Sequence, residues 1–267
     1  MKKVLNLAFI LSLAFLSVGH ASASSLLMTD GNPIARMTVG NPTVSVGKLN
    51  KGLAAEFILK TKYYNATTNR VDNRTPYNNH GTNNGGTVAG TDGFDFDGND
   101  DYISIPNNNA LNVDNAFTIA TWAQFDAVAD SPSIYTKHEE DDDTGYLLQV
   151  WNSKLLVQYG DGGGGWPYSD TGGLLQSDTA LSNGTWYHIA VTRSGANVDF
   201  YVNGENDGSI TNAPSGNISN NTTEAWIGGD VNLTGSSYDM EGKLTKLKIY
   251  KRVLAANEVK SLYDQGR

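Results

Sequence analysis

Short apolar runs alternate with clusters of Gly, Asn, Asp and Ser from residue 52 to the end of the chain. The clearest runs cover residues 117–125, 145–151, 186–192, 198–202 and 244–250. Runs of this length, separated by turn-forming residues at short intervals, are typical of strands in an all-β sandwich or barrel. Within 198–202 alternate residues are apolar, and Asn203-Gly204 follows as a favoured hairpin turn. The pattern therefore predicts an all-β, antiparallel fold.

Only one segment shows a helical pattern. In residues 255–263, Val259, Leu262 and Tyr263 fall on one side at helical spacing, which predicts a short C-terminal helix packed against the sandwich. Residues 24–51 are small and polar with scattered Val and Leu, so they form either a linker or one added edge strand. Residues 52–267 have the length of a single sandwich domain.

The N-terminus has the features of a secretory signal peptide. Lys2 and Lys3 precede an apolar run at 5–18, and Ala21-Ser22-Ala23 is a small-residue cleavage site, so residues 1–23 are predicted to be removed. The alternative is an uncleaved N-terminal anchor. No second run of this kind occurs, so we expect no membrane span after cleavage and a secreted protein, extracellular or at the cell surface.

Charge and cysteine content narrow the classes of partner. The chain has 19 basic and 28 acidic residues, a net charge of −9, which argues against nucleic acid as a partner. An acidic, Asn- and Gly-rich surface suits neutral, hydroxyl-rich ligands, and divalent cations where carboxylates converge. Because there is no cysteine, stability must come from burial and strand pairing.

Several phrases occur in an order that resembles a known family. They are Asn79-His80-Gly81-Thr82, the run 94–103 (FDFDGNDDYI), 117–122 (FTIATW), 186–192 (WYHIAVT), Tyr201-Val202-Asn203-Gly204, Ile227-Gly228-Gly229 and Leu247-Lys248-Ile249-Tyr250. Together they resemble the laminin-G-like domains of the concanavalin A-like superfamily. The resemblance implies a two-sheet antiparallel jelly-roll sandwich, with ligands bound at loop rims or on the concave face.

The same resemblance implies one calcium ion. Family members often hold it with an acidic residue before the N-H-G-T phrase, and Asp72 is the residue that matches here. This chain departs from the family near Thr245 and Lys246, where acidic residues are common, and a lysine repels a cation. The run 95–100 is not an EF-hand loop, because its Gly is misplaced and its twelfth position is Pro106.

No catalytic constellation is evident. A retaining glycosidase needs two carboxyl groups about 5 Å apart, and the nearest patterns, Asp95-x-Asp97 and Asp239-x-Glu241, lack a third acidic residue. There is no nucleophile elbow. His188 lies within an apolar strand, which favours a structural role. We therefore expect a protein that is not an enzyme.

Sugar recognition uses flat aromatic faces together with polar groups that bind hydroxyls. Trp166 and Tyr168 interrupt a Gly-rich stretch that ends at Asp170, and these three residues are the leading ligand-binding candidates. Trp151 and Tyr238 are secondary candidates. Trp166 is alternatively a loop plug that covers a sheet edge. The strand positions of Trp122, Trp186 and Trp226 instead predict that these three tryptophans belong to the core.

The leading interpretation is a secreted, non-catalytic, lectin-like module that binds an extracellular or cell-surface glycan. The alternative is a structural or adhesive surface protein that binds protein partners. A third interpretation is a polysaccharide-degrading enzyme without the usual acid pair. Loss of glycan binding on replacement of Trp166, capture of a protein partner, or release of product from a polysaccharide would distinguish them.

Overall fold

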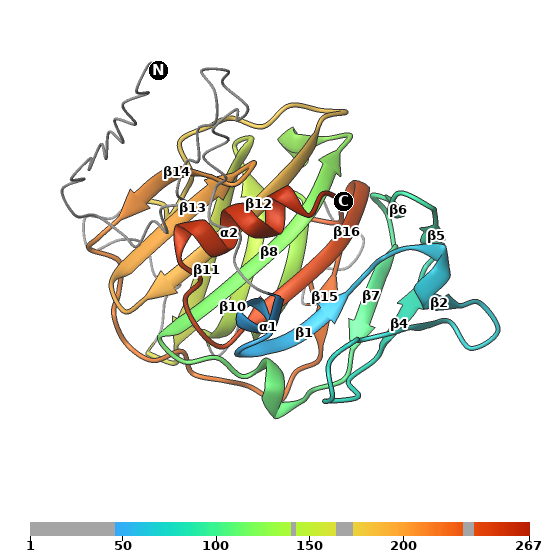
Figure 1. The fold of residues 1–267 in the computed structure, drawn as a ribbon, viewed down its shortest axis with the longest axis horizontal. Helices are drawn as coiled ribbons and strands as arrows, with labels where there is room; N and C mark the ends of the chain where they lie inside the picture. The colour runs from blue at the N-terminus through green and yellow to red at the C-terminus, as the bar shows by residue number, and fades with distance from the viewer. Residues whose placement is uncertain (1–45, 140–142, 164–172, 232–237) are drawn as a thin grey trace, which may run out of the picture. The chain divides into compact units, whose positions relative to one another are not determined.

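The chain forms two antiparallel sheets that pack face to face (Figure 1). This arrangement buries the apolar residues that alternate with polar ones along the strands. The computed structural model describes residues 46–139, 143–163, 173–231 and 238–267. The predicted strand runs are all present, and each lies within an observed strand or begins and ends within a few residues of it. The predicted all-β sandwich with a short C-terminal helix is confirmed.

Sheet A has the strand order β14-β13-β12-β8-β16-β6-β5, and β1 also pairs with β16. Its strands are β1 (Leu53–Phe57), β5 (Val88–Ala89), β6 (Phe94–Asp97), β8 (Ala116–Phe125), β12 (Trp186–Ser194), β13 (Asn197–Val202), β14 (Glu205–Ile210) and β16 (Glu241–Tyr250). The β13–β14 hairpin turns at Asn203 and Gly204, which have φ of 52° and 81°, as the Asn-Gly pair predicts.

Sheet B has the order β11-β10-β9-β15-β7-β4-β3-β2. Its strands are β2 (Tyr64–Asn65), β3 (Arg70–Val71), β4 (Gly81–Asn84), β7 (Tyr102–Ile105), β9 (Ser133–Glu139), β10 (Thr144–Trp151), β11 (Lys154–Asp161) and β15 (Ala225–Ile227). Three short 3-10 helices, η1 (Thr61–Tyr63), η2 (Asn109–Leu111) and η3 (Val128–Asp130), lie in the connections.

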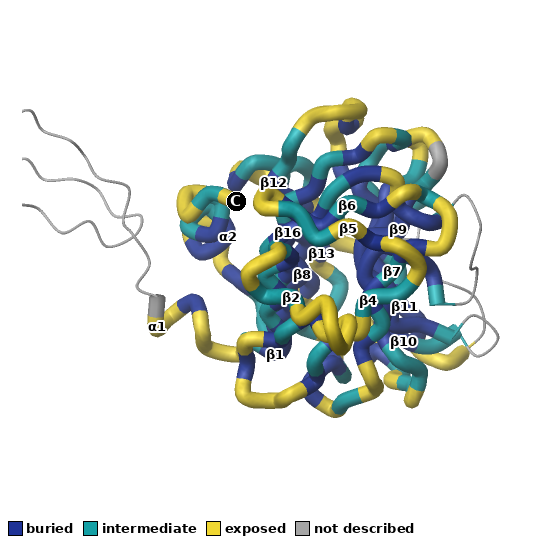
Figure 2. The backbone as a smooth tube through the Cα atoms, turned by 90° about the vertical axis from the view of Figure 1, so that its right-hand side faces the viewer, coloured by how far each residue is buried: buried dark blue, intermediate teal, exposed yellow. Residues whose placement is uncertain are grey.

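The main core fills the space between the two sheets, where Figure 2 shows the buried backbone. Sheet A contributes alternate residues of β8, such as Phe117, Ile119 and Phe125, and sheet B contributes Tyr146 and Leu148 from β10. Because side chains alternate across a strand, the remaining positions of each strand point to the outer face of its sheet. The outer faces are therefore the surfaces on which a site can be built.

A second, smaller cluster holds α2 (Ala256–Asp264) against the outer face of sheet A (Figure 1). Val259 and Leu262 of the helix pack with Ala120 and Ala190 of the sheet, as the helical spacing in the sequence predicts. The predicted helix, 255–263, is thus confirmed with its ends shifted by one residue.

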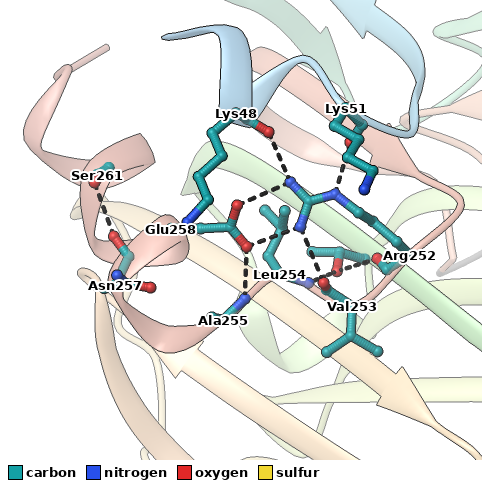
Figure 3. Close-up of polar contacts among 10 residues, drawn as sticks. Lys48, Lys51, Arg252, Val253, Leu254, Ala255, Asn257, Glu258 and Ser261 are labelled. Carbon is teal, nitrogen blue, oxygen red and sulfur yellow. Dashed lines mark hydrogen bonds and ion pairs between the residues drawn. The ribbon is translucent and has the colours of Figure 1, made fainter. Parts of the chain in front are cut away.

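Arg252 joins this helix to the N-terminal part of the domain (Figure 3). Its guanidinium donates to the Lys48 and Lys51 carbonyl oxygens at 3.0 and 2.6 Å, and to both Glu258 carboxylate oxygens at 2.8 and 2.9 Å. This contact holds the pKa of Glu258 below its ordinary value. Lys48 belongs to α1 (Val46–Leu49), a single helical turn at the end of the predicted linker or edge strand.

Candidate functional site

The outer face of sheet B carries a band of polar and aromatic side chains on its central strands. In β7, Ile103 and Ile105 belong to the core, so Tyr102 and Ser104 point outward. The strand register places Trp226 of β15 and Thr82 of β4 on either side of Ser104. We call this surface, formed by Thr82, Asn84, Tyr102, Ser104, Glu224 and Trp226, the sheet B platform.

An aromatic pair forms the centre of the sheet B platform. The rings of Tyr102 and Trp226 stack with their centroids 3.7 Å apart and their planes 12° from parallel. Trp226 is only 6% exposed, whereas Tyr102 is half-buried. The Trp226 indole N–H donates to the Glu224 carboxylate at 2.6 Å. Burial, together with the negative charges of Glu224 and Asp100, raises the pKa of Tyr102 above its ordinary value, and the protonated hydroxyl can donate a hydrogen bond.

Polar groups suited to hydroxyl recognition border this pair. The Asn84 side chain donates to the Ser104 hydroxyl at 3.0 Å and to the Thr82 carbonyl at 2.9 Å. Asn84, Ser104 and Glu224 are half-buried and Thr82 is exposed, so this part of the face is accessible. Flat rings beside amide, hydroxyl and carboxylate groups are the combination that a pyranose requires for stacking and for hydrogen bonding.

The chain after β15 folds back over the neighbouring strand. Gly228, with φ of 84°, allows the turn, and a Cβ on Gly229 would lie 3.2 Å from the Tyr102 Cβ atom. The Thr136 hydroxyl donates to the Gly229 carbonyl at 3.0 Å, and His138 Nε2 contacts Asp230 Oδ1 at 2.9 Å. The segment therefore borders the sheet B platform on its β9 side.

The five predicted ligand-binding residues fall into two groups. Trp166, Tyr168 and Asp170 lie outside the described residues. Trp151 is the last residue of β10 and is half-buried. Because Leu148 and Val150 point into the core, Trp151 lies on the outer face of sheet B. Tyr238 is also half-buried, and its carbonyl accepts from the Ser133 N–H at 2.8 Å. Because Ser133 pairs with Gln149, Tyr238 and Trp151 lie toward the same end of sheet B.

Asp72, the predicted calcium ligand, is paired with the guanidinium of Arg70. Its Oδ1 lies 2.8 Å from Arg70 Nη2 and accepts from Arg70 Nε at 2.9 Å, and His80 Nδ1 is 3.5 Å away. A metal ion at Asp72 would have to compete with the Arg70 guanidinium.

A second acidic group lies where β6 turns toward β7, in the segment that the sequence analysis rejected as an EF-hand loop. Ligand oxygens of Asp97, Asp100 and Asp101 lie within 4.8 Å of one another and could hold a metal ion. Asp101 is buried, and it accepts hydrogen bonds from the Gly86 and Asp97 N–H groups. Burial is the main cause that raises the pKa of Asp101, and the charges of Asp97 and Asp100 add to it. A bound cation would offset this repulsion.

The prediction that Trp122, Trp186 and Trp226 belong to the core is wrong for Trp122 and Trp186, which are half-buried, whereas Trp226 is buried, with 6% of it exposed. None of them is part of the cluster between the sheets. Phe117 and Ile119 point into the core from β8, so Trp122, at an even-numbered position of the same strand, points outward. The same alternation puts Trp186 on the outer face of sheet A and Trp226 on that of sheet B. Strict alternation in Tyr102-Ile103-Ser104-Ile105 would also have predicted the outward position of Tyr102.

Within the ranges that the structure describes, no helix has the length and apolar character needed to cross a membrane.

Comparison with protein families gives one match. The model Laminin_G_3, described as the concanavalin A-like lectin/glucanases superfamily, matches residues 97–260. None of the curated protein sequences compared with the chain matches it.

Many solved structures share the fold at low sequence identity. One, reported with the finding that cell entry of botulinum neurotoxin type C depends on interaction with two ganglioside molecules, has a TM-score of 0.62 and 11% identity, over 83% of this chain and 53% of that one. Domain 4 of AbnA, an extracellular GH43 arabinanase from Geobacillus stearothermophilus in complex with arabinotriose, has a TM-score of 0.56 and 19% identity, over 79% and 98%.

The binding domain of Paraclostridial Mosquitocidal Protein 1 has a TM-score of 0.55 and 15% identity, over 81% of this chain and 53% of that one. The chain spans about half the length of the toxin-derived structures that it matches. At these identities the likeness shows the shared fold.

Proposed function

The chain belongs to the Laminin_G_3 family of the concanavalin A-like lectin/glucanases superfamily, and we propose that it is a secreted, non-catalytic module that binds an extracellular or cell-surface glycan. The observation that carries this proposal is the stacked Tyr102–Trp226 pair, bordered by half-buried amide, hydroxyl and carboxylate groups on an outer sheet face. The arabinotriose complex of the AbnA domain supports it, since that domain matches over nearly its whole length.

The proposed binding surface extends over sheet B. Trp151 and Tyr238 lie toward one end of this sheet, and Trp166, Tyr168 and Asp170 follow its strand β11 in the sequence. A glycan of several residues would contact the sheet B platform with one sugar and these further aromatic residues with others. The predicted role of the Trp166 segment is part of this proposal.

Replacement of Tyr102 by alanine is expected to weaken glycan binding about tenfold, because the stacking ring and its hydroxyl are both lost. The experiment is a glycan-array screen of the mature chain from Ser24, followed by calorimetric titration of the best ligand with the wild type, Tyr102→Ala and Trp166→Ala. Tyr77→Ala is the matched control, since Tyr77 is 50% exposed outside the sheet B platform.

A blank array with the wild type would refute glycan binding and favour the structural or adhesive alternative, in which the partner is a protein. A glycan that binds Tyr102→Ala and Tyr77→Ala equally well would place the site away from the sheet B platform. Release of product from a polysaccharide would contradict the non-catalytic part of the proposal.

Calcium is expected to raise the melting temperature of the protein, and a chelator is expected to reverse the change. Two candidate sites differ in chemistry: Asp72 is engaged by Arg70, whereas Asp97, Asp100 and Asp101 converge in one turn. Thermal melts of Asp97→Asn/Asp100→Asn and of Asp72→Asn distinguish them, because only the variant that removes the true ligands loses the shift. A wild type whose melting temperature is the same with calcium and with chelator would contradict a calcium site of either kind.

A further inference from the structure

A group of basic residues lies on the outer face of sheet A, on the opposite side of the sandwich from the sheet B platform. Lys246 and Lys248 extend from β16, and Lys60 follows β1, the strand that pairs with β16. We call Lys60, Lys246 and Lys248, together with Trp122 and His188, the sheet A basic site. It is a local concentration of positive charge on a chain whose net charge is −9.

A small cavity lies at the centre of the sheet A basic site. Its lining includes Trp122, His188, Lys246, Lys248 and Gln265, and its volume is about 10 Å³. This is close to the space that one water molecule needs. An oxygen atom of a carboxylate or sulfate group has a similar size.

Two nitrogens of the lining residues are unsatisfied by the protein itself. Among the described residues, neither His188 Nδ1 nor Trp122 Nε1 has a hydrogen-bond partner, and both atoms are buried. His188 is 2% exposed. A buried polar group without a partner destabilises a fold, so such a group in a native structure calls for a ligand or a water molecule.

The charges around the cavity favour an anion over a neutral molecule. Lys248 Nζ pairs with Glu56 at 2.8 Å, whereas Lys246 Nζ donates to the Gln265 and Gly266 carbonyl oxygens, which carry no formal charge. Burial is the main cause that lowers the pKa of Lys246; the charges of Lys60 and Lys248 lower it further, and the charge of Glu56 partly opposes them. Burial and both β16 lysines lower the pKa of His188 to about 3, so His188 is neutral at neutral pH. The positive charges of Lys60, Lys246 and Lys248 therefore lie close together, and the negative charge of Glu56 neutralises only part of them.

We propose that the sheet A basic site binds the carboxylate or sulfate group of an acidic polysaccharide, with one oxygen of that group in the cavity. The Trp122 indole N–H donates to this oxygen, and Lys246 and Lys60 supply the balancing charge. This site is separate from the proposed glycan site on sheet B and does not depend on it. Its ligand, an acidic polysaccharide, is one that the net charge of the chain alone would not have suggested.

The test is a titration of the full chain with polygalacturonate, dextran sulfate, neutral dextran and free sodium sulfate. Binding is measured by calorimetry, and the Trp122 indole N–H signal is followed by NMR and assigned with Trp122→Phe. We expect the two acidic polymers to bind and to shift this signal, with an affinity that falls as salt is added, and we expect neutral dextran to have no effect. Lys60→Gln/Lys246→Gln should weaken binding roughly tenfold, which corresponds to about 1.4 kcal/mol.

Glutamine at position 246 can still donate to the Gln265 and Gly266 carbonyls, so α2 should remain docked, and circular dichroism checks this. Lys154→Gln, in the β10–β11 hairpin of sheet B, is the matched control and should bind as the wild type does. Equal binding by the double variant and the wild type, or no binding of either acidic polymer at low salt, would overturn the proposal. A response to free sulfate alone would refute the polysaccharide as its ligand. Tyr102 lies on sheet B, so the Tyr102→Ala experiment tests the glycan site independently of the sheet A basic site. A negative result for one site does not decide the other.

Discussion

Replacement of Arg193 by alanine is expected to lower the free energy of unfolding by about 3 to 5 kcal/mol. Arg193 extends from β12 toward the interior and is 0% exposed. Its guanidinium donates to the Asp114, Pro214 and Gly216 carbonyl oxygens at 3.2, 3.1 and 2.6 Å, and it lies 4.0 Å from the ring centroid of Tyr159. Alanine would remove one donor from each of these three carbonyls, although the Tyr159 hydroxyl still donates to the Pro214 carbonyl at 3.0 Å, and it would leave a cavity beside Tyr159.

Chemical denaturation measures this effect, and the melting temperature should fall by roughly 10 °C. Arg70→Ala is the matched control, because Arg70 is 51% exposed and pairs with the half-exposed Asp72, so its loss should cost at most about 1 kcal/mol. If the two variants lost the same stability, water would be replacing the guanidinium at the three carbonyls, and Arg193 would not be holding the segment that contains Pro214 and Gly216.

The strands and the hairpin were predictable because their signals are local. Alternation in 198–202 and the Asn203-Gly204 turn depend on neighbouring residues, and the C-terminal helix depends on residues three and four positions apart. The face on which each tryptophan lies was predictable by the same rule, but the three tryptophans were assigned to the core because they lie in strands, without asking which face of the strand each one occupies. Their outward placement shows that the outer faces of this sandwich are only partly polar.

The candidate sites were less predictable because they join residues from distant parts of the sequence. Tyr102 and Trp226 come into contact only when β7 and β15 pair. The Asp101 carboxylate accepts hydrogen bonds from the N–H groups of Gly86, fifteen residues away, and of Asp97. The sheet A basic site similarly requires β1, β8, β12 and β16 to be in register. The composition predicted an acidic surface suited to neutral ligands. It could not predict that Lys60, Lys246 and Lys248 would form a basic site on an acidic chain.

The long connection between β14 and β15 also depends on contacts with residues that are distant in the sequence. Residues 217–223 are low in complexity and carry no strand or helix pattern. Two buried cations hold this connection in the structure: Arg193 binds the Pro214 and Gly216 carbonyls, and Lys137 binds the Asn221 and Thr223 carbonyls. Backbone carbonyls exist at every residue, so no sequence signal marks the ones that a distant cation will bind.

Lys137→Met is expected to lower the free energy of unfolding by about 2 to 4 kcal/mol near neutral pH. Lys137 is 1% exposed, and its ammonium donates to Asn107 Oδ1, Asn221 Oδ1 and the Asn221 and Thr223 carbonyls at 2.9 to 3.2 Å. Methionine has a similar length but no donor, so these four part-buried oxygens lose the ammonium as a donor. Lys154→Met, at the β10–β11 turn, is the matched control and should change stability by about 0.5 kcal/mol or less.

The stability that Lys137 contributes should also depend on pH. Burial lowers its pKa from 10.5 to about 8 in the folded state. Between these two values the unfolded chain binds more protons than the folded one, so the stability of the wild type relative to Lys137→Met should rise with pH. Solvent screening limits the gain to on the order of 1 kcal/mol between about pH 7 and pH 10. Denaturant titrations of both proteins across this range test it, since other titrating groups cancel in the difference. A constant difference would show that the four oxygen acceptors offset the cost of burial and keep Lys137 charged throughout.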